Sequence, residues 1–239
     1  MLIVLSFQMS CPDCALPQPR APFHQCVDNG PMCFNCFKHR LFPWALDTVC
    51  GLPMVTRMRE KVVPQAHGHV LEIGIGTGLN MPHYDAQKVT RITGLDPALE
   101  LQPKARQRIE ASGMSVDLIA LSAETIPLPS GHFDSAVITY ALCTIPDALA
   151  ALKEIRRVLK PGAPLLFCEH GLSPDAAVAR WQNRLQPLWG PLAGGCHLNR
   201  DIPALVQSAG FRLEELEQAY VPGPKPWAFH SWGEAQADT

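Results

Sequence analysis

The spacing of apolar residues predicts a chain in which short buried strands alternate with helices. Largely apolar runs of strand length lie at 69–73, 91–95, 115–121, 133–140 and 164–168. Apolar residues at helical spacing lie at 41–63 with a break at Gly51-Leu52-Pro53, from about Pro103 to Ala111, and at 149–159. The turn Lys160-Pro161-Gly162 ends the last of these helices before the fifth strand.

This βαβαβ order predicts an α/β fold. Parallel strands need crossover connections, so we expect a mostly parallel sheet with helices on both faces, in three α/β/α layers. Further helices are expected at 174–185 and 200–209. Apolar runs at 211–216 and 227–232 would complete the sheet, with an antiparallel hairpin at its edge as one arrangement. Ligands of such sheets bind at the carboxyl ends of the strands.

Residues 1–40 and 41–239 differ in composition and in the periodicity of their apolar residues, so we divide the chain into an N-terminal extension and one domain. The extension is rich in Cys and Pro and lacks apolar periodicity. It holds two C-x-x-C pairs at the spacing of a four-thiolate zinc site, formed by Cys11, Cys14, Cys33 and Cys36. Zinc is therefore a candidate cofactor of this extension, and a thiol-rich leader without structure is the alternative.

The composition is that of a soluble globular protein, with 47% hydrophobic and 18% charged residues. A net charge of −2 without a Lys or Arg run disfavours nucleic acid as a partner. The apolar start at 1–7 is too short to cross a bilayer, so we expect neither a signal peptide nor a transmembrane anchor. Nine cysteines, an odd number, suit reduced thiols and a cytoplasmic location better than a disulfide framework.

Three glycines at spacing two follow the first strand, at Gly74, Gly76 and Gly78. Glycines at this point let the backbone turn sharply and approach a ligand closely. The dinucleotide fingerprint G-x-G-x-x-G needs a further glycine where this chain has Leu79. The loop therefore predicts a ligand at the sheet edge and disfavours a nicotinamide dinucleotide.

Two carboxylates accompany the glycine loop. Asp96 ends the second strand, where it would meet a ribose diol, and Glu72 adds a second negative group near the pocket floor. Together they suit a cationic ligand better than a pyrophosphate. A second interpretation, compatible with the first, makes Asp96 the N-cap of a helix that begins at Pro97.

These residues resemble the class I methyltransferases that use S-adenosylmethionine (AdoMet). The segments Ser122–Pro129 and Gly131–Asp134 look like the family's adenine-side loop and its entry into the fourth strand, and Leu159–Ala163 looks like the turn before the fifth. The resemblance implies AdoMet as the cofactor and a Rossmann-like, seven-stranded sheet. It implies cofactor contacts from Glu72, Gly74, Ile75, Gly76, Gly78, Asn80, Asp96, Pro97, Ala123, Glu124 and Tyr140.

A narrower similarity covers the chain from Phe42 onward, in the motifs Phe42-Pro43-Trp44, Leu142-Cys143-Thr144, Phe167-Cys168-Glu169-His170, Trp181 and 195–200. They resemble a small methyltransferase-like branch whose animal members are membrane-associated alkyl thiol methyltransferases, which makes a small thiol the leading acceptor. Ser122 departs from the family, because many members place an acidic residue there. The animal members begin with an apolar anchor, and this chain has the cysteine-rich extension in its place. We therefore do not expect this chain to share their membrane anchoring, and peripheral contact with a membrane is the alternative.

A thiol acceptor must react as the thiolate, so a base or a favourable field is expected near the cofactor. Glu169 and His170, at the end of the fifth strand, are the catalytic candidates, and Cys196-His197 lies in a glycine-rich loop that could cover the site. Small buried thiols usually pack as hydrophobic groups, as we expect for Cys143 and Cys168. Core packing is also favoured over a place in the acceptor pocket for Phe37, Trp181 and Trp189.

Three functions remain open at this point. The leading one is AdoMet-dependent methylation of a small acceptor, a thiol first and a quinone or phospholipid amine next. The second is a non-catalytic AdoMet-binding protein with a zinc site in its N-terminal extension. The third, a nicotinamide oxidoreductase, is disfavoured by Leu79.

Overall fold

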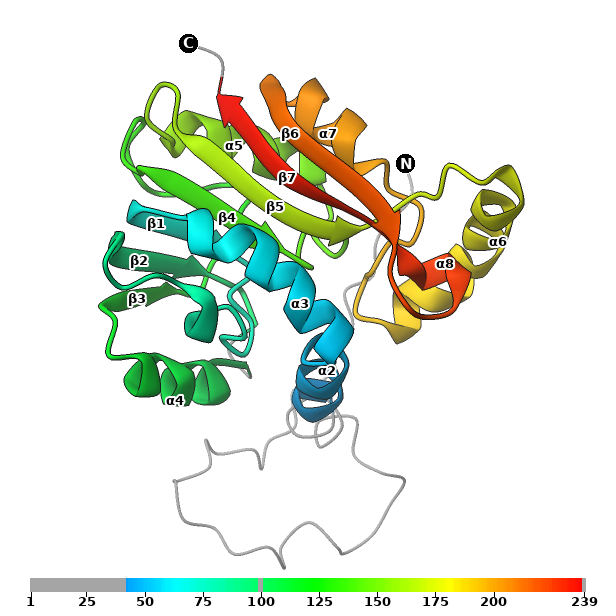
Figure 1. The fold of residues 1–239 in the computed structure, drawn as a ribbon, viewed down its shortest axis with the longest axis horizontal. Coiled ribbons are helices and arrows are strands. Elements are labelled where there is room, and N and C mark those ends of the chain that lie inside the picture. The colour runs from blue at the N-terminus through cyan, green and yellow to red at the C-terminus, as the bar shows by residue number, and fades with distance from the viewer. Residues whose placement is uncertain (1–41, 99–100, 238–239) are drawn as a thin grey trace, which may run out of the picture.

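The computed structural model describes residues 42–98 and 101–237 (Figure 1). Its helices are α2 (Phe42–Cys50), α3 (Pro53–Val62), α4 (Gln102–Ser112), α5 (Ala148–Val158), α6 (Ala176–Leu192), α7 (Ile202–Ser208) and α8 (Lys225–Ala228), with 3-10 turns η2 (Val63–Gln65) and η3 (Met81–His83). Its strands are β1 (Gly68–Ile73), β2 (Val89–Leu95), β3 (Val116–Ile119), β4 (Ser135–Thr139), β5 (Pro164–His170), β6 (Phe211–Tyr220) and β7 (Phe229–Ala237). The predicted extension at 1–40, with its candidate zinc ligands Cys11, Cys14, Cys33 and Cys36, lies outside the described residues.

The strands form one seven-stranded sheet in the order β3-β2-β1-β4-β5-β7-β6. All pairs from β3 to β5 are parallel, whereas β7 runs antiparallel to both β5 and β6. This confirms the mostly parallel Rossmann-like sheet and its antiparallel edge hairpin. The strand order reverses direction between β1 and β4, and such a switch point opens a crevice at the carboxyl ends of the strands.

Two expected segments differ from the structure. The run 227–232 is not one strand, because α8 occupies Lys225–Ala228 and β7 begins at Phe229. Helix α6 does not end at 185 but continues to Leu192, through Pro187 and Pro191. Tertiary contacts hold this last part in place, since the Gln186 side chain bonds the backbone of 196–198. Proline inside a helix is unfavourable, so the sequence alone predicts that the helix ends before Pro187. That prediction does not include the stabilising tertiary contacts.

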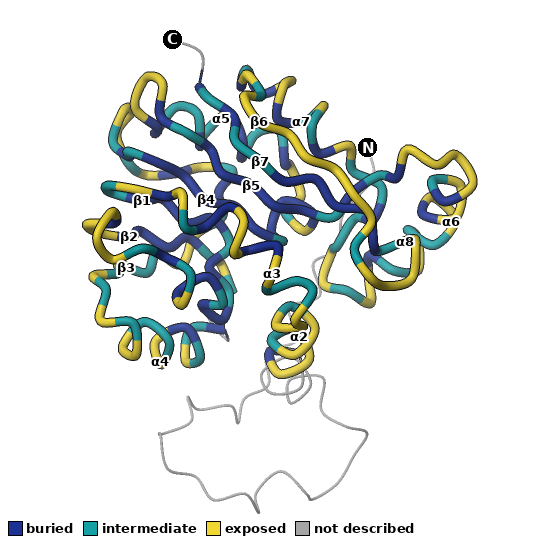
Figure 2. The backbone as a smooth tube through the Cα atoms, in the orientation of Figure 1, coloured by how far each residue is buried: buried dark blue, intermediate teal, exposed yellow. Residues whose placement is uncertain are grey.

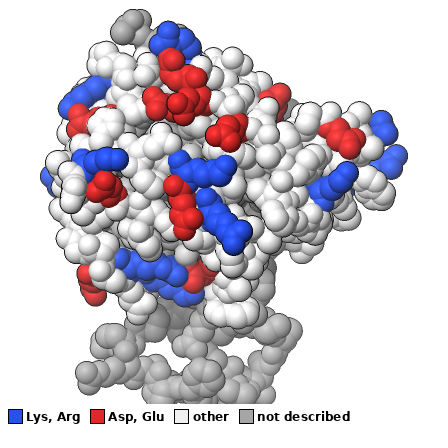
Figure 3. Space-filling model, viewed as in Figure 1, with Lys and Arg blue, Asp and Glu red and all other residues white. Residues whose placement is uncertain are grey.

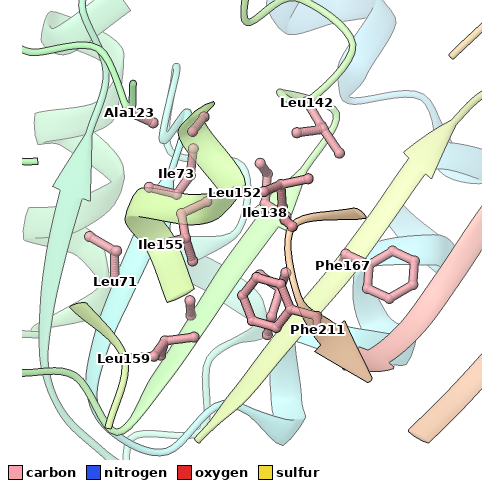
Figure 4. Close-up of a cluster of buried hydrophobic side chains, with 14 of the residues drawn as sticks. Leu71, Ile73, Ala123, Ile138, Leu142, Leu152, Ile155, Leu159, Phe167 and Phe211 are labelled. Carbon is pink, nitrogen blue, oxygen red and sulfur yellow. The ribbon is translucent and has the colours of Figure 1, made fainter. Parts of the chain in front are cut away.

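Both faces of the sheet are covered, which confirms the three-layer arrangement (Figures 1 and 2). One face packs against α5 and α7 in the larger core, where Leu71, Ile73, Ile138, Leu152 and Ile155 converge (Figure 4). The other face packs against α3, η2 and η3. Neighbouring residues of β4 divide between the two cores, because successive strand side chains point to opposite faces.

Surface charge of both signs is interspersed over the face shown in Figure 3. Among the described residues, no helix combines the length and the hydropathy that a bilayer-spanning segment requires.

Candidate cofactor and acceptor site

A cavity of about 300 Å³ opens at the carboxyl ends of β1, β2 and β4, at the predicted switch point. Of the predicted cofactor residues, eight line it: Gly74, Ile75, Gly76, Asn80, Asp96, Pro97, Ala123 and Tyr140. Glu72, Gly78 and Glu124 do not line it. The remaining wall is largely apolar and comes from α2, Arg59 of α3, the rest of the glycine loop, the loop after β3, the β4–α5 turn and residues 193–194.

The glycine loop has the backbone shape that only glycine adopts without strain. Gly74, Gly76 and Gly78 have φ angles of 67°, 55° and 79°. A side chain at Gly74 would overlap the Cβ of Ala141, well inside the 3.0 Å limit of real Cβ contacts. A Cβ at Gly78 would lie 3.2 Å from the Cα of Ala105, so this glycine lets α4 approach the loop closely. Gly76 instead faces the cavity, with no atom nearer than 3.7 Å to a built Cβ.

Asp96 connects the second strand to the glycine loop. One carboxylate oxygen accepts the Gly76 N–H at 2.8 Å, and the other accepts the Ala98 N–H at 2.8 Å. The bond to Ala98 closes a local turn. The N-cap interpretation is wrong, because α4 begins only at Gln102 with Leu101 as its N-cap residue. Asp96 therefore presents a fixed carboxylate at the cavity wall, where it can accept hydroxyl hydrogen bonds.

Glu72 lies beneath the cavity and positions Asn80. Its two oxygens accept hydrogen bonds from Asn80 Nδ2 and from the Tyr84 hydroxyl, both at 2.9 Å. Asn80 is also bonded to Thr139 at the end of β4, and it lines the cavity. Burial raises the pKa of Glu72 to about 7, while the bonds from Tyr84 and Asn80 oppose that rise.

The raised pKa of Glu72 predicts a pH-dependent stability that Glu72→Gln removes. Between pH 4.5 and about 7 the unfolded chain has released this proton and the folded chain retains it. The contribution of Glu72 to the free energy of unfolding should therefore fall as pH rises through that window, by at most about 1.4 kcal/mol per pH unit, and level off above it. Urea unfolding of both proteins across the window measures the difference.

The matched control for this test is Glu217→Gln, which removes an exposed carboxylate on β6. It should leave the pH profile of the wild type unchanged. Equal slopes in the wild type and Glu72→Gln would contradict the assignment of the proton to Glu72.

The predicted adenine-side loop lies at the cavity only in part. Ser122 and Ala123 line it, whereas the Glu124 carboxylate accepts the Ser122 hydroxyl at 2.8 Å and the Asp147 N–H at 2.7 Å. Glu124 thus fixes this loop against the start of α5.

An ionic cluster that the sequence analysis missed holds the glycine loop from outside. Asp47 on α2 accepts hydrogen bonds from the Thr77 hydroxyl at 2.6 Å, from Arg108 at 2.7 Å and from Lys104 at 2.9 Å. Burial alone would raise the pKa of Asp47, but these donors hold it well below its usual range. Arg108 also donates to the Thr77 carbonyl. Helix α2, the loop and α4 are therefore bound together by one carboxylate.

Arg59 is a further residue that the sequence analysis missed. It lies on α3 beside Met58 and Val62, is only 4% exposed and lines the cavity. Its guanidinium donates to the Cys50 carbonyl at 2.7 Å and lies 4.9 Å from the centre of the Tyr140 ring, while Nε has no partner among the described residues. An arginine on the apolar face of a helix is a sequence signal that could have revealed it.

Tyr140 marks the turn after β4. It has φ 54°, the only positive value among the described non-glycine residues, and such strained backbone is enriched at functional sites. Its ring is held between Arg59 and His230. Burial raises its pKa well above the usual value, so the phenol stays protonated at the cavity wall.

The two catalytic candidates of the sequence lie behind the cavity wall. One oxygen of Glu169 accepts the N–H groups of Ala141 and Leu142, at 2.8 and 2.9 Å, so it shapes the β4–α5 turn. Burial raises the pKa of Glu169 to about 7, and the two backbone bonds oppose this. Neither Glu169 nor His170 lines the cavity.

His170 instead forms a cluster with Cys143 and Cys196. Its Nε2 lies 3.3 Å from the Cys196 Sγ, and the three potential ligand atoms all lie within 4.8 Å of one another. Hydrogen bonding by Cys143 and by His170 lowers the pKa of Cys196, while burial opposes it. Burial by itself would lower the pKa of His170, but Cys196 and Glu169 raise it. The expectation that Cys143 acts as simple packing is therefore incomplete.

The remaining candidates lie elsewhere. Cys168 is fully buried in β5, Trp181 is exposed, and Trp189 stacks edge-on with Trp227 at 5.2 Å. None of the three lines the cavity, and Phe37 lies outside the described residues. His197 donates its backbone N–H to the Cys143 carbonyl and thereby holds the 195–197 loop on the β4–α5 turn.

Residues 71–167 match the family model described as a methyltransferase domain. The chain is 31% identical over 162 residues to the thiol S-methyltransferase TMT1B of Rattus norvegicus, covering 66% of this chain and 65% of the relative. It thus spans just under two thirds of that relative's length. It is also 31% identical over 160 residues to the phosphatidylethanolamine N-methyltransferase of Cereibacter sphaeroides, covering 63% of this chain and 72% of that protein.

A SAM-dependent methyltransferase from Thermotoga maritima has a similar solved structure, with a TM-score of 0.59 and 22% identity, covering 85% of this chain and 99% of that one. Its fold agrees with the seven-stranded sheet described above. The family's cofactor also agrees with the cavity, because Asp96 and the open space above Gly76 fit a nucleoside. Together with the matched domain and the curated relatives, this places the chain in the family of class I methyltransferases that depend on S-adenosylmethionine.

Proposed function

We propose that this chain transfers the methyl group of AdoMet to a small thiol. The observation that carries the proposal is the buried Arg59 guanidinium, which lines the same largely apolar cavity as the glycine loop and Asp96. A buried cation beside an apolar wall stabilises a thiolate in preference to a neutral acceptor. The similarity to a thiol S-methyltransferase supports the same choice.

The cofactor half of the cavity would be formed by the residues at the ends of β1 and β2. Asp96 would accept the ribose hydroxyls, and Gly74 and Gly76 would let the backbone approach the cofactor. Ala123 and Ser122 would border the adenine, while Glu72 would act at a distance by holding Asn80. When bound, AdoMet supplies an electrophilic methyl group on a sulfonium.

The acceptor half would be formed by Arg59, Tyr140 and the apolar wall from Leu46, Ile145 and Pro146. Arg59 would lower the pKa of the acceptor thiol and hold its sulfur, and the apolar wall would exclude water. A general base in contact with the acceptor is not required by this arrangement. Glu169 and His170 would then contribute through the shape of the β4–α5 turn and the 195–197 loop, rather than by contact with the reacting atoms.

Arg59→Gln tests the acceptor role. Removing a cation close to a thiol should shift the pH profile of kcat/KM to higher pH by about 1 unit or more, while the Kd of AdoMet changes by less than about threefold. Calorimetric titration with AdoMet checks the fold and the cofactor site of the variant. Arg59→Lys retains the charge and should restore part of the wild-type profile.

A different result has a defined meaning. If Arg59→Gln weakens AdoMet binding by more than about tenfold and leaves the pH profile in place, the guanidinium serves the cofactor carboxylate and not the acceptor.

The acceptor class itself is tested by product analysis. Purified protein with AdoMet and a small alkyl thiol should yield the methyl thioether, detected by mass spectrometry. Phosphatidylethanolamine vesicles and a reduced quinone are the alternative acceptors, favoured in the first case by the similarity to the enzyme of Cereibacter sphaeroides. Bound AdoMet without thioether formation would reject the thiol proposal, and bound AdoMet without turnover of any of the three would favour a non-catalytic AdoMet-binding protein.

A further inference from the structure

Three potential metal ligands meet behind the cavity, and none of them contacts the reacting atoms in the proposed methyl transfer. Cys143 follows β4, His170 ends β5 and Cys196 follows α6, so three separate segments supply them. Their ligand atoms lie within 4.8 Å of one another, and the Cys143 side chain is only 3% exposed. Local sequence spacing does not bring these residues together; the fold does.

We propose that Cys143, His170 and Cys196 form a zinc site that fastens the 193–197 segment against the end of the sheet. Two thiolates and an imidazole are the ligand types that Zn²⁺ prefers, and three protein ligands leave a fourth coordination position. Tetrahedral zinc places a sulfur about 3.6 Å from a nitrogen and two sulfurs about 3.8 Å apart. The 3.3 Å between Cys196 Sγ and His170 Nε2 needs only a small adjustment to match.

The charge around the cluster is compatible with a divalent cation held by two thiolates. Glu169 is fully buried beside His170, and its Oε2 has no hydrogen-bond partner among the described residues. Arg200 is a permanent cation near the cluster, and its guanidinium donates to the carbonyl of Leu142. A Zn²⁺ ion bound by two thiols, with release of two protons, forms a unit without net charge, so the ion can be buried beside Glu169 without adding an unpaired charge.

Zinc at this position would act on the wall of the cofactor cavity. Ala193 and Gly194 line the cavity, and Cys196 follows them by two residues. The segment is also held by hydrogen bonds from the His197 N–H to the Cys143 carbonyl at 2.9 Å, from the Gly195 N–H to the Gly190 carbonyl at 2.8 Å and from Gln186 to the Cys196 carbonyl at 3.1 Å. The metal would therefore join the β4–α5 turn, the end of β5 and the cavity-lining segment.

The test separates this site from the cysteines of the N-terminal extension. The full chain is produced with Cys11, Cys14, Cys26, Cys33 and Cys36 all changed to Ser, which removes the thiols of residues 1–40. This parent protein is assayed for zinc by atomic emission after dialysis and is titrated with Co²⁺. We expect about one metal ion per chain and a thiolate-to-cobalt charge-transfer band.

Three variants of this parent identify the ligands. Cys196→Ser and Cys143→Ala should each weaken zinc binding by more than about tenfold and reduce the cobalt band. Cys168→Ala is the matched control, because it also removes a buried thiol but lies outside the cluster, and it should bind metal as the parent does. Circular dichroism of each variant shows whether it is folded.

Two results would overturn the proposal. One is a folded parent that binds neither zinc nor cobalt, including the case in which peptide maps show Cys143 and Cys196 joined as a disulfide. The other is undiminished metal binding in both cluster variants. AdoMet titration of the same samples is an independent measurement, so a failure of the zinc site and a failure of the methyltransferase proposal give different results.

Discussion

Asp96→Ala is expected to bind AdoMet about 30- to 1,000-fold more weakly than the wild type, a loss of about 2–4 kcal/mol. The substitution removes the carboxylate that would accept the ribose hydroxyls. It also releases the N–H groups of Gly76 and Ala98, each now held at 2.8 Å, so the middle of the glycine loop is freed while the Gly74 N–H bond to the Leu95 carbonyl of β2 remains. Calorimetric titration with AdoMet, with NAD as the competing dinucleotide, measures the change.

Two variants make this result specific. Asp96→Asn preserves the shape and one acceptor oxygen and should fall between the wild type and the alanine variant. Asp117→Ala removes a carboxylate on the neighbouring strand β3, where it pairs with Arg91 at the surface, and should leave the Kd unchanged. If Asp96→Ala changes the Kd by less than about threefold, the ribose assignment is wrong.

Gly74→Ala is expected to abolish measurable AdoMet binding and to reduce the free energy of unfolding by about 2–5 kcal/mol. A residue with a side chain pays about 1–2 kcal/mol for the left-handed backbone, here φ 67°. The added methyl group would also overlap the Cβ of Ala141, which overpacks the base of the cavity by about a further 1–3 kcal/mol. Relief of this overlap would displace the β4–α5 turn that forms the opposite wall.

Gly113→Ala separates the two causes. Gly113 has φ 68° at the end of α4, yet an added Cβ would meet no atom within 4 Å. It should therefore cost only the backbone term of about 1–2 kcal/mol and leave AdoMet binding intact. Urea unfolding and AdoMet titration of both variants test this, and equal losses in the two would refute the steric explanation.

Much of the cofactor half could be predicted from the sequence, because its signals are local. The apolar runs before Gly74 and Asp96 predict two strands that end side by side, and parallel strands bring their carboxyl ends to one edge. The glycine spacing then predicts the sharp turn that the positive φ angles show. Glu72 and Glu124 are near the site in sequence but not at the cavity, because side-chain direction depends on packing that spacing does not reveal.

Residues from distant segments meet only in the tertiary structure. Asp47 and Arg108 are 61 residues apart, and His170 and Cys196 are 26 apart, so no local period relates them. The position of β7 between β5 and β6 likewise cannot be predicted from the apolar runs. An apolar run indicates that a strand is present but not which strands lie beside it. The sequence by itself determined the alternation of elements and the glycine–Asp96 edge, since hydrophobic period and backbone freedom are local properties. The tertiary structure alone decided where Arg59 meets the cavity and that Cys143, His170 and Cys196 form a cluster, since both arrangements arise where separately encoded elements pack together.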